Sequence, residues 1–248
     1  MFPFFIDPRY LIFVMLPTVA LTMFAQWWVK RAYRKASEIQ NMQNVTGAQA
    51  ARRILDSAGL SYVNIETTAP VQSMRYATAG ATPQLDDHYD PSDKVLRLSP
   101  GVYTGTSVAA LGVAAHEAGH AIQDAQGYPW MRARSAIVPA ANIGTQFGIF
   151  IVIIGFVIHA VGLAWIGVGA FALGTVFSLL TLPVELNAST RAMQALTANG
   201  LVDRTQYGEA RSVLNAAAFT YIAALAASLL NLLYWVMLVS GMGGRRRN

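Results

Sequence analysis

The sequence predicts a mainly α-helical, polytopic membrane protein with about four transmembrane helices and a small α+β domain at the membrane edge. Of its 248 residues, 54% are hydrophobic and only 12% are charged, a balance unlike that of a soluble enzyme of this length. Several apolar runs are long enough to cross a bilayer. A polar stretch with helical and strand-like patterns lies between the first two runs and predicts the small domain.

Four apolar runs define the predicted transmembrane helices. The first, residues 10–29, contains Pro17, where we expect a kink. The second and third runs form a tight hairpin within residues 144–182, and the fourth covers residues 216–239. The other segments are an N-terminal tail (1–9), a polar domain (30–143), a connecting segment (183–215) and a basic C-terminal tail (240–248).

The distribution of Lys and Arg predicts how these helices are oriented. Segments 30–143 and 183–215, on one side of the bilayer, hold eleven and three of them, whereas the two tails hold four. Because such residues near span ends favour the cytoplasmic side, we expect the polar domain in the cytoplasm, beneath a bacterial-type plasma membrane. The three arginines at 245–247 oppose this orientation. Basic residues beside apolar runs indicate a lipid bilayer as partner and no nucleic acid.

Within the polar domain, residues 46–59 have the pattern of a capped helix that Gly59 ends. Residues 62–66 and 95–98 alternate as short strands do, with a long Ala-, Thr-, Pro- and Asp-rich stretch between them. We therefore expect a small sheet. If residues 95–98 form a free edge of that sheet, an extended substrate could pair with it.

The strongest chemical signal is the run His116-Glu117-Ala118-Gly119-His120. Residues four apart share one face of a helix, so His116 and His120 can bind one metal ion. Glu117 lies beside that face, where a carboxylate can take a proton from water on the metal. Thr106 or Ser107 can cap the start of this helix, and Gly127 and Pro129 mark its end. Domain 30–143 is therefore the predicted catalytic domain.

A catalytic zinc ion usually has three protein ligands, and the third is not given by this motif. The chain has no cysteine, so the candidates are His88, His159 or a carboxylate. Glu185 follows the third span on the side of the motif helix, although a glutamate at a helix end can simply be interfacial. His159 is predicted near the opposite interface. His88 lies in a charged segment that ends in Pro91 and could form a solvated turn.

Several motifs together resemble the YugP-type family of membrane zinc metallopeptidases, over nearly the whole chain. They are Thr46-Gly47, Arg53-Ile54-Leu55, Asp87-His88-Tyr89-Asp90-Pro91, Arg97-Leu98-Ser99, Ser107-Val108-Ala109-Ala110, the run 114–123 and Pro183-Val184-Glu185. The combination of the upstream Asp-His-Tyr-Asp-Pro and the downstream Pro-Val-Glu with the histidine motif is specific. The resemblance implies an integral membrane peptidase with a zincin-like catalytic domain.

The resemblance also implies a ligand set: one zinc ion held by His116, His120 and Glu185, so that segment 183–215 carries the third ligand. In the wider group of glutamate-liganded peptidases, a polar residue four positions beyond that ligand supports the first histidine, and here it is Ser189. Two departures are Asn187, where the family usually has aspartate, and a seemingly longer segment between residues 65 and 86. Because of this longer segment, we expect the reach of the protein toward substrates to differ from that of the family.

The predicted function is therefore zinc-dependent hydrolysis of peptide bonds in membrane or membrane-proximal proteins and peptides, with Glu117 as general base. We expect His88 and Tyr89 beside the cleft, where either could donate a hydrogen bond to the oxyanion. The oligomeric state does not follow from the sequence.

Three alternatives compete with this interpretation. An intramembrane, site-2-like protease would place the motif inside a spanning helix, but Gln123, Asp124 and Gln126 make this helix too polar for lipid. A transporter would need polar residues that meet within the membrane, and Asn142, Gln146 and Asn231 are few. A non-catalytic metal-binding scaffold would have no need of Glu117.

Overall fold

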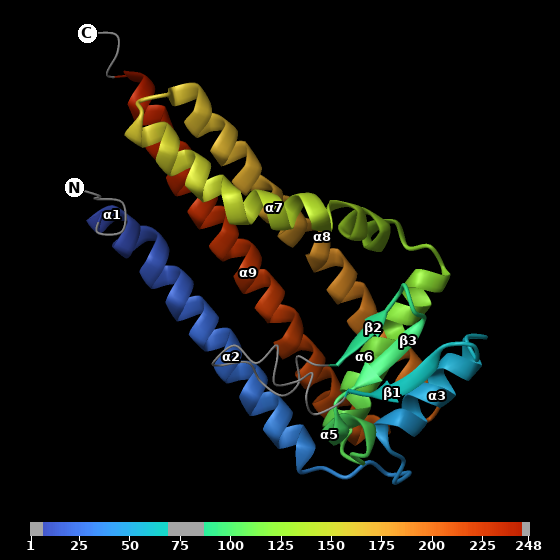
Figure 1. The fold of residues 1–248 in the computed structure, drawn as a ribbon. Coiled ribbons are helices and arrows are strands. Elements are labelled where there is room, and N and C mark those ends of the chain that lie inside the picture. The colour runs from blue at the N-terminus through green and yellow to red at the C-terminus, as the bar shows by residue number, and fades with distance from the viewer. Residues whose placement is uncertain (1–6, 69–86, 245–248) are drawn as a thin grey trace. The chain divides into compact units, whose positions relative to one another are not determined.

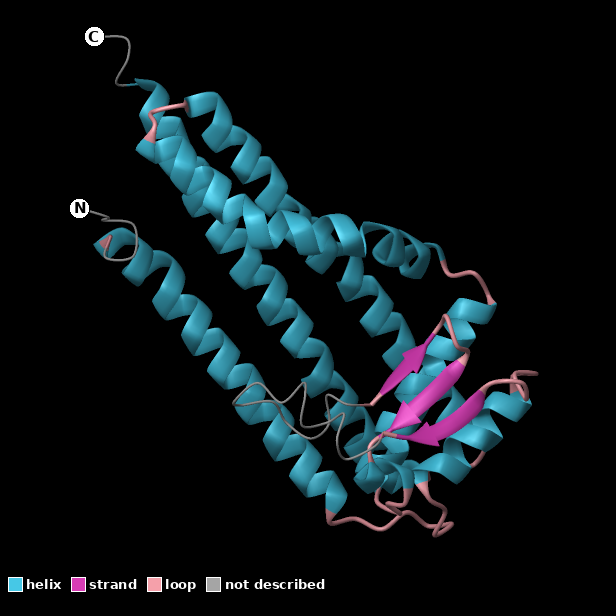
Figure 2. Ribbon diagram, viewed as in Figure 1, coloured by secondary structure: helices cyan, strands magenta, loops and turns pink. Residues whose placement is uncertain are grey.

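The computed structural model describes residues 7–68 and 87–244, and its chain divides into two compact units (Figure 1). The span unit consists of Met1–Gln26, Pro129–Val184 and Phe219–Asn248, and the sheet unit consists of Trp27–Tyr128 and Glu185–Ala218. Helices dominate the described residues, with one three-stranded sheet (Figure 2). The predicted fold class, mainly helical with four long apolar helices and a small sheet, is confirmed. Most of the long stretch after residue 65, and the arginines at 245–247, lie outside the described residues.

Four helices are long and apolar enough to cross a membrane. They are Pro8–Ser37, Pro129–Val157, Val161–Ala198 and Arg204–Met242. Each extends beyond the apolar run that predicted it: α7 (Pro129–Val157), α8 (Val161–Ala198) and α9 (Arg204–Gly244) all continue into polar sequence. Helix α7 runs through Pro139 and α8 through Pro183, so neither proline ends a helix as it usually would. Glu185 is consequently part of the same helix as the third candidate span.

The first candidate span starts with a local irregularity. It comprises α1 (Pro8–Tyr10), a π-helical segment, η1 (Leu11–Met15), and α2 (Leu16–Ser37). Asp7 caps the start by accepting a hydrogen bond from the Arg9 N–H at 2.9 Å. The π-helical segment ends two residues before Pro17, which has no N–H to continue the normal helical pattern. The kink expected at this proline stays a prediction.

Helices α7 and α8 pack closely through glycines. A Cβ at Gly148 would lie 2.7 Å from the backbone nitrogen of Phe171, and one at Gly167 would lie 2.5 Å from that of Val152. Such small residues allow the backbones of spanning helices to approach each other. Residues 158–160 join the two helices, and His159 lies in this turn with φ of 55°. Trp235 of α9 joins Val152 in the buried core of this unit.

The span unit also contains a cavity of about 640 Å³ between α7, α8 and α9. Its polar lining residues are Asn142, Thr145, Gln146, Thr175, Ser178 and Ser228. Asn142 and Gln146 lie near the middle of the observed α7, not at a helix end as the shorter predicted span implied. Among the described residues that line the cavity, none carries a charge.

The sheet of the sheet unit has the strand order β1-β3-β2. Strand β1 (Asn64–Thr67) is parallel to β3 (Val95–Leu98), with Asn64 opposite Val95, and β2 (His88–Asp90) is antiparallel to β3, with Tyr89 opposite Leu96. The predicted strands are present, the first starting two residues and ending one residue later than expected, and β2 is additional. The expected free edge at residues 95–98 is wrong, because β3 is the central strand and pairs on both sides.

Helices cover this sheet and bury the core of the unit (Figure 1). Helix α3 (Gly47–Ser57) begins with the capping box of Thr46 and Gln49, and Gly59 follows its end with φ of 73°. A short helix, α5 (Pro100–Tyr103), precedes α6 (Val108–Ala125), whose first turn is capped by Ser107. Because α6 contacts α3, α5 and two strands, most of its residues are buried.

One contact between α6 and α8 depends on a missing side chain. A Cβ at Gly119 would lie 2.8 Å from the carbonyl oxygen of Ala188, closer than real Cβ contacts come. At Gly112, on the same helix, the nearest such atom is the Ala210 carbonyl oxygen at 3.9 Å, which is ordinary contact. Gly119 is therefore needed for the close approach of α6 to α8, whereas Gly112 leaves room for a side-chain methyl group, although both are buried in α6.

We predict opposite effects of alanine at these two positions. Gly119→Ala should lower the free energy of unfolding by about 1–3 kcal/mol, because the methyl group pushes α6 away from α8. Gly112→Ala should leave stability unchanged or raise it by up to about 1 kcal/mol, through the better helix propensity of alanine. Thermal unfolding of both variants in detergent measures this. Equal stability of the two would contradict the close contact at Gly119.

Candidate metal centre

Three side chains of the sheet unit meet where α6 and α8 pack together. His116 and His120 lie one turn apart on α6, and Glu185 lies on α8. One ligand-type atom from each lies within 4.8 Å of the other two. Glu185 Oε2 is 3.2 Å from His116 Nε2 and 3.6 Å from His120 Nε2. Both imidazoles therefore direct their Nε2 atoms toward the same carboxylate oxygen.

The burial of this group requires compensating charge. Glu185 is 2% exposed, and an isolated buried carboxylate is strongly destabilising. The two histidines face it. Burial lowers the pKa of His120, but the interaction with Glu185 and the charge of Glu117 outweigh that effect and raise this pKa above its usual value. Two imidazoles and one carboxylate are a donor set that suits Zn²⁺, so these residues fit a zinc ion.

Each histidine also has a partner at its other ring nitrogen. Ser189 Oγ lies 3.3 Å from His116 Nδ1, the pair that the family resemblance implied. Gln123 Oε1 lies 3.0 Å from His120 Nδ1. Sequence reasoning treated Gln123 only as a polar residue of the helix. Its position three residues after His120, on the same helical face, was the available signal.

Glu117 follows His116 on α6 and has a hydrogen-bond partner of its own. Its Oε2 accepts a hydrogen bond of 3.1 Å from the backbone N–H of Tyr89, in β2. Burial raises the pKa of the Glu117 carboxyl to about 8, and the charges of Asp87 and Glu185 add to this. The Tyr89 N–H and His120 act in the opposite direction. The strand that the sequence did not predict therefore positions this carboxyl.

The Tyr89 side chain is turned into the protein. Its hydroxyl donates to Asp124 Oδ2 at 2.7 Å, and Lys94 Nζ lies 2.6 Å from the same oxygen. Burial, together with the hydrogen bond to Asp124, raises the pKa of Tyr89. The phenol that we expected beside the cleft thus has a partner on α6, and its role toward an oxyanion stays a prediction.

His88 and His159 were the other candidates for a third ligand. The group of His116, His120 and Glu185 includes neither of them, as far as the described part of the chain extends. His88 is exposed on β2, next to the buried Tyr89. His159 belongs to the turn between α7 and α8 in the span unit. A role of His88 toward substrate also stays a prediction.

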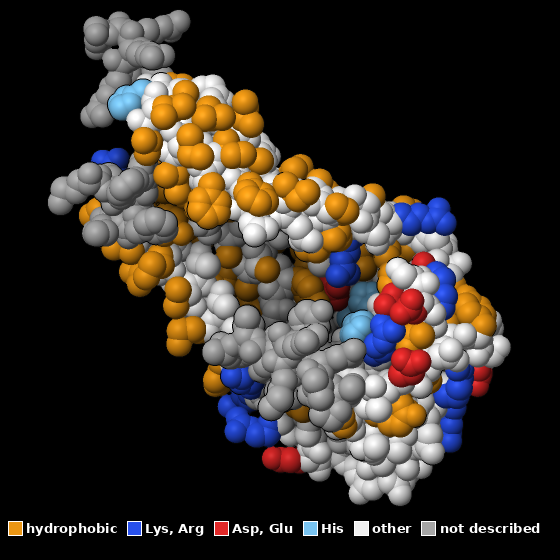
Figure 3. All heavy atoms as spheres, in the orientation of Figure 1, with side chains coloured by type: hydrophobic (Ala, Val, Ile, Leu, Met, Phe, Trp, Pro, Cys, Tyr) orange, Lys and Arg blue, Asp and Glu red, His pale blue; other side chains and the backbone are white. Residues whose placement is uncertain are grey.

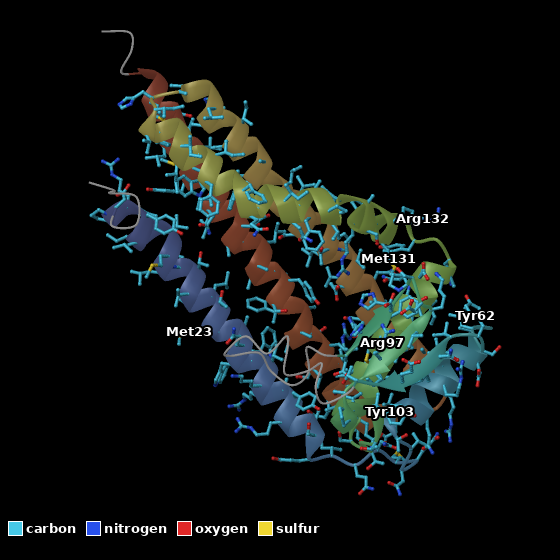
Figure 4. All side chains as sticks on the ribbon, viewed as in Figure 1. Met23, Tyr62, Arg97, Tyr103, Met131 and Arg132 are labelled. Atoms are coloured by element: carbon cyan, nitrogen blue, oxygen red, sulfur yellow. The ribbon has the colours of Figure 1, made fainter. Side chains whose placement is uncertain are left out.

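Charged side chains fix the turn that joins β2 to β3. Arg97, labelled in Figure 4, bonds Asp90 Oδ2 and Asp93 Oδ2, each at 2.8 Å. The hydrogen bond from Arg97 lowers the pKa of Asp90. Acidic, basic and histidine side chains gather on this part of the surface in Figure 3. The ion pairs tie β2, and with it the Tyr89 N–H, to the central strand.

Comparison with known proteins adds independent information. A family described as "Putative neutral zinc metallopeptidase" matches residues 11–240. The "Putative membrane protease YugP" of Bacillus subtilis (strain 168) is 37% identical over 237 residues, which is 96% of this chain and 99% of that protein. No solved structure matches. A match of this extent shows the family, and it agrees with the resemblance carried by the motifs: the chain belongs to the neutral zinc metallopeptidase family.

Proposed function

We propose that the protein is a membrane-bound zinc-dependent metalloendopeptidase in which His116, His120 and Glu185 hold one zinc ion. The observation that carries this proposal is the convergence of these three side chains within 4.8 Å, with Glu117 beside them on α6. Zinc held there would supply Lewis acidity, which polarises a peptide carbonyl and lowers the pKa of water.

Glu117 acts as general base and then as general acid. Its carboxylate takes a proton from the attacking water, and the protonated carboxyl returns a proton to the leaving amine. A group that must both accept and release a proton works best when neither form is strongly favoured; burial raises the pKa of Glu117, and the positive charge of a bound zinc ion would lower it. The Tyr89 N–H keeps one carboxyl oxygen in place. The other oxygen is the one we propose for the proton transfer.

The proposed substrates are membrane or membrane-proximal proteins and peptides. Glu185 supports this choice, because it belongs to α8, which is also a candidate span. The name of the Bacillus relative, "Putative membrane protease YugP", points the same way. We further propose that the sheet unit faces the cytoplasm, on the basis of the Lys and Arg distribution.

The alternatives are supported less well. An intramembrane protease would carry its motif in a spanning helix, but α6 is not among the four candidate spans found in the described residues. A metal-binding scaffold has no use for a buried glutamate next to the ligands, where burial alone is costly. A transporter would gain support from the polar cavity of the span unit, yet its described lining carries no charge.

We predict that Glu185→Ala removes most of the bound zinc from the purified protein. A two-histidine site has lost its only anionic ligand, so its affinity falls sharply. His159→Asn is the control, because asparagine tolerates the positive φ at this position and the turn lies outside the site. Elemental analysis of both variants gives the zinc content. Full occupancy in the Glu185 variant would exclude it as a ligand.

Glu117→Gln separates an enzyme from a scaffold. The amide keeps an acceptor for the Tyr89 N–H, so fold and zinc content should persist, but it cannot take a proton from water. Cleavage of fluorescein-labelled casein by detergent-purified protein should fall about a hundredfold to ten-thousandfold. Glu209→Gln, at the ion pair with Lys35, is the matched control. Undiminished cleavage with zinc bound would show that Glu117 is not the base.

Sidedness can be tested because the chain has no cysteine. Ser92 and Ile158 are exposed, the first in the turn after β2 and the second at the turn between α7 and α8. In intact cells, Ser92→Cys should resist a membrane-impermeant maleimide while Ile158→Cys reacts with it. After lysis both should react. The reverse pattern in intact cells would place the sheet unit outside the cell.

A further inference from the structure

We propose that Arg191, acting through Asn187 and Gln123, fixes the proton of His120 on Nδ1, so that the Nε2 lone pair is free to bind the metal. These three are positioning residues, since none is proposed to touch substrate or zinc. The inference rests on the proposed role of His120 as a ligand.

The direction of the chain of hydrogen bonds is set at its outer end. A guanidinium has five donors and no acceptor. Arg191 Nε lies 2.6 Å from the side-chain amide of Asn187, so the atom facing it must be the oxygen, Oδ1. Arg191 is itself held, because its Nη1 donates to Gln126 Oε1 at 2.7 Å. Its guanidinium also lies 5.9 Å from the centre of the Tyr128 ring.

The next step follows from the orientation of Asn187. Gln123 Nε2 donates to the same Asn187 Oδ1 at 2.9 Å. With its amide nitrogen committed there, Gln123 turns its carbonyl oxygen toward His120, 3.0 Å from Nδ1. A carbonyl oxygen only accepts, so Nδ1 must carry the proton. Gln123 is 0% exposed, and this burial hinders the amide flip that would turn its nitrogen toward His120.

The result at His120 is one defined tautomer. In a neutral imidazole with its proton on Nδ1, Nε2 has the free lone pair that a metal ligand needs. That Nε2 lies 3.6 Å from Glu185 Oε2, which is beyond hydrogen-bond distance, so the carboxylate does not hold a proton there. His116 is held differently: the Ser189 hydroxyl can donate or accept, so it orients the ring without selecting a tautomer. The relay formed by Arg191, Asn187 and Gln123 therefore sets the tautomer of His120 through the ring nitrogen opposite Nε2.

The relay is tested with variants that break or keep it. Gln123→Leu and Asn187→Leu remove it, whereas Asn187→Asp keeps it, because Asn187 takes part only through an oxygen that accepts. Arg191→Met removes the donor at the outer end of the relay. Because Arg191 is only half-buried, this substitution should disturb folding less than the leucine substitutions. Asn199→Leu, in the turn directly after α8, removes an amide that contacts Ser57 instead and is the matched control.

Two readouts are used on the full chain in detergent. Competition with a zinc chelator should give about 10–100-fold weaker zinc binding for Gln123→Leu, a smaller loss for Asn187→Leu and Arg191→Met, and wild-type values for Asn187→Asp and Asn199→Leu. Nitrogen-15 spectra of histidine-labelled, zinc-free protein at alkaline pH report the tautomers directly, since there are only four histidines. Wild-type His120 should carry its proton on Nδ1. In Gln123→Leu it should move to Nε2.

Three results would overturn the relay. They are a His120 proton on Nε2 in the wild type, an unchanged tautomer in both leucine variants, or equal losses of zinc affinity in Asn187→Asp and Asn187→Leu. If the wild type bound no zinc, the proposed function would fail, but the tautomer comparison would still decide the relay.

Discussion

The arrangement around the site follows from one constraint: the carboxylate of Glu185 is almost fully buried and must be partnered. Its partners, His116 and His120, come from another helix, so α6 and α8 must pack tightly at this point. Each histidine then needs support at its remaining nitrogen, which Ser189 and Gln123 provide. A buried charge thus determines both the spacing of the helices and the polar residues between them.

Two buried glutamates lie close together in this site and are given different surroundings. Glu185 faces two imidazoles, which suits a group that stays ionised and binds a cation. Glu117 has one backbone N–H as hydrogen-bond partner, and burial with the charges of Asp87 and Glu185 outweighs the effect of His120, so its pKa is raised to about 8. The same residue type therefore serves two proposed purposes, as ligand and as proton carrier, because the environment separates their proton affinities.

Features with a local signal were predicted from the sequence, and features made by distant contacts were not. The four spans, the capped start of α3 and the motif helix α6 each depend on neighbouring residues. Strand β2 has three residues and exists only because it pairs with β3, so the edge expected at 95–98 was wrong. The contact of Gln123 with Asn187 joins residues 64 apart in the sequence, and no local sequence pattern predicts such a pair.

The close contact at Gly119 bears on how the motif itself should be read. Its two middle positions carry no chemistry and are usually written as any residue. Here Ala118 is fully buried, and a side chain at Gly119 would meet the backbone of Ala188. Those positions are therefore restricted by shape almost as strictly as the histidines are by chemistry. A motif search that requires small residues at these two positions would select for chains in which a second helix packs this closely against the motif helix.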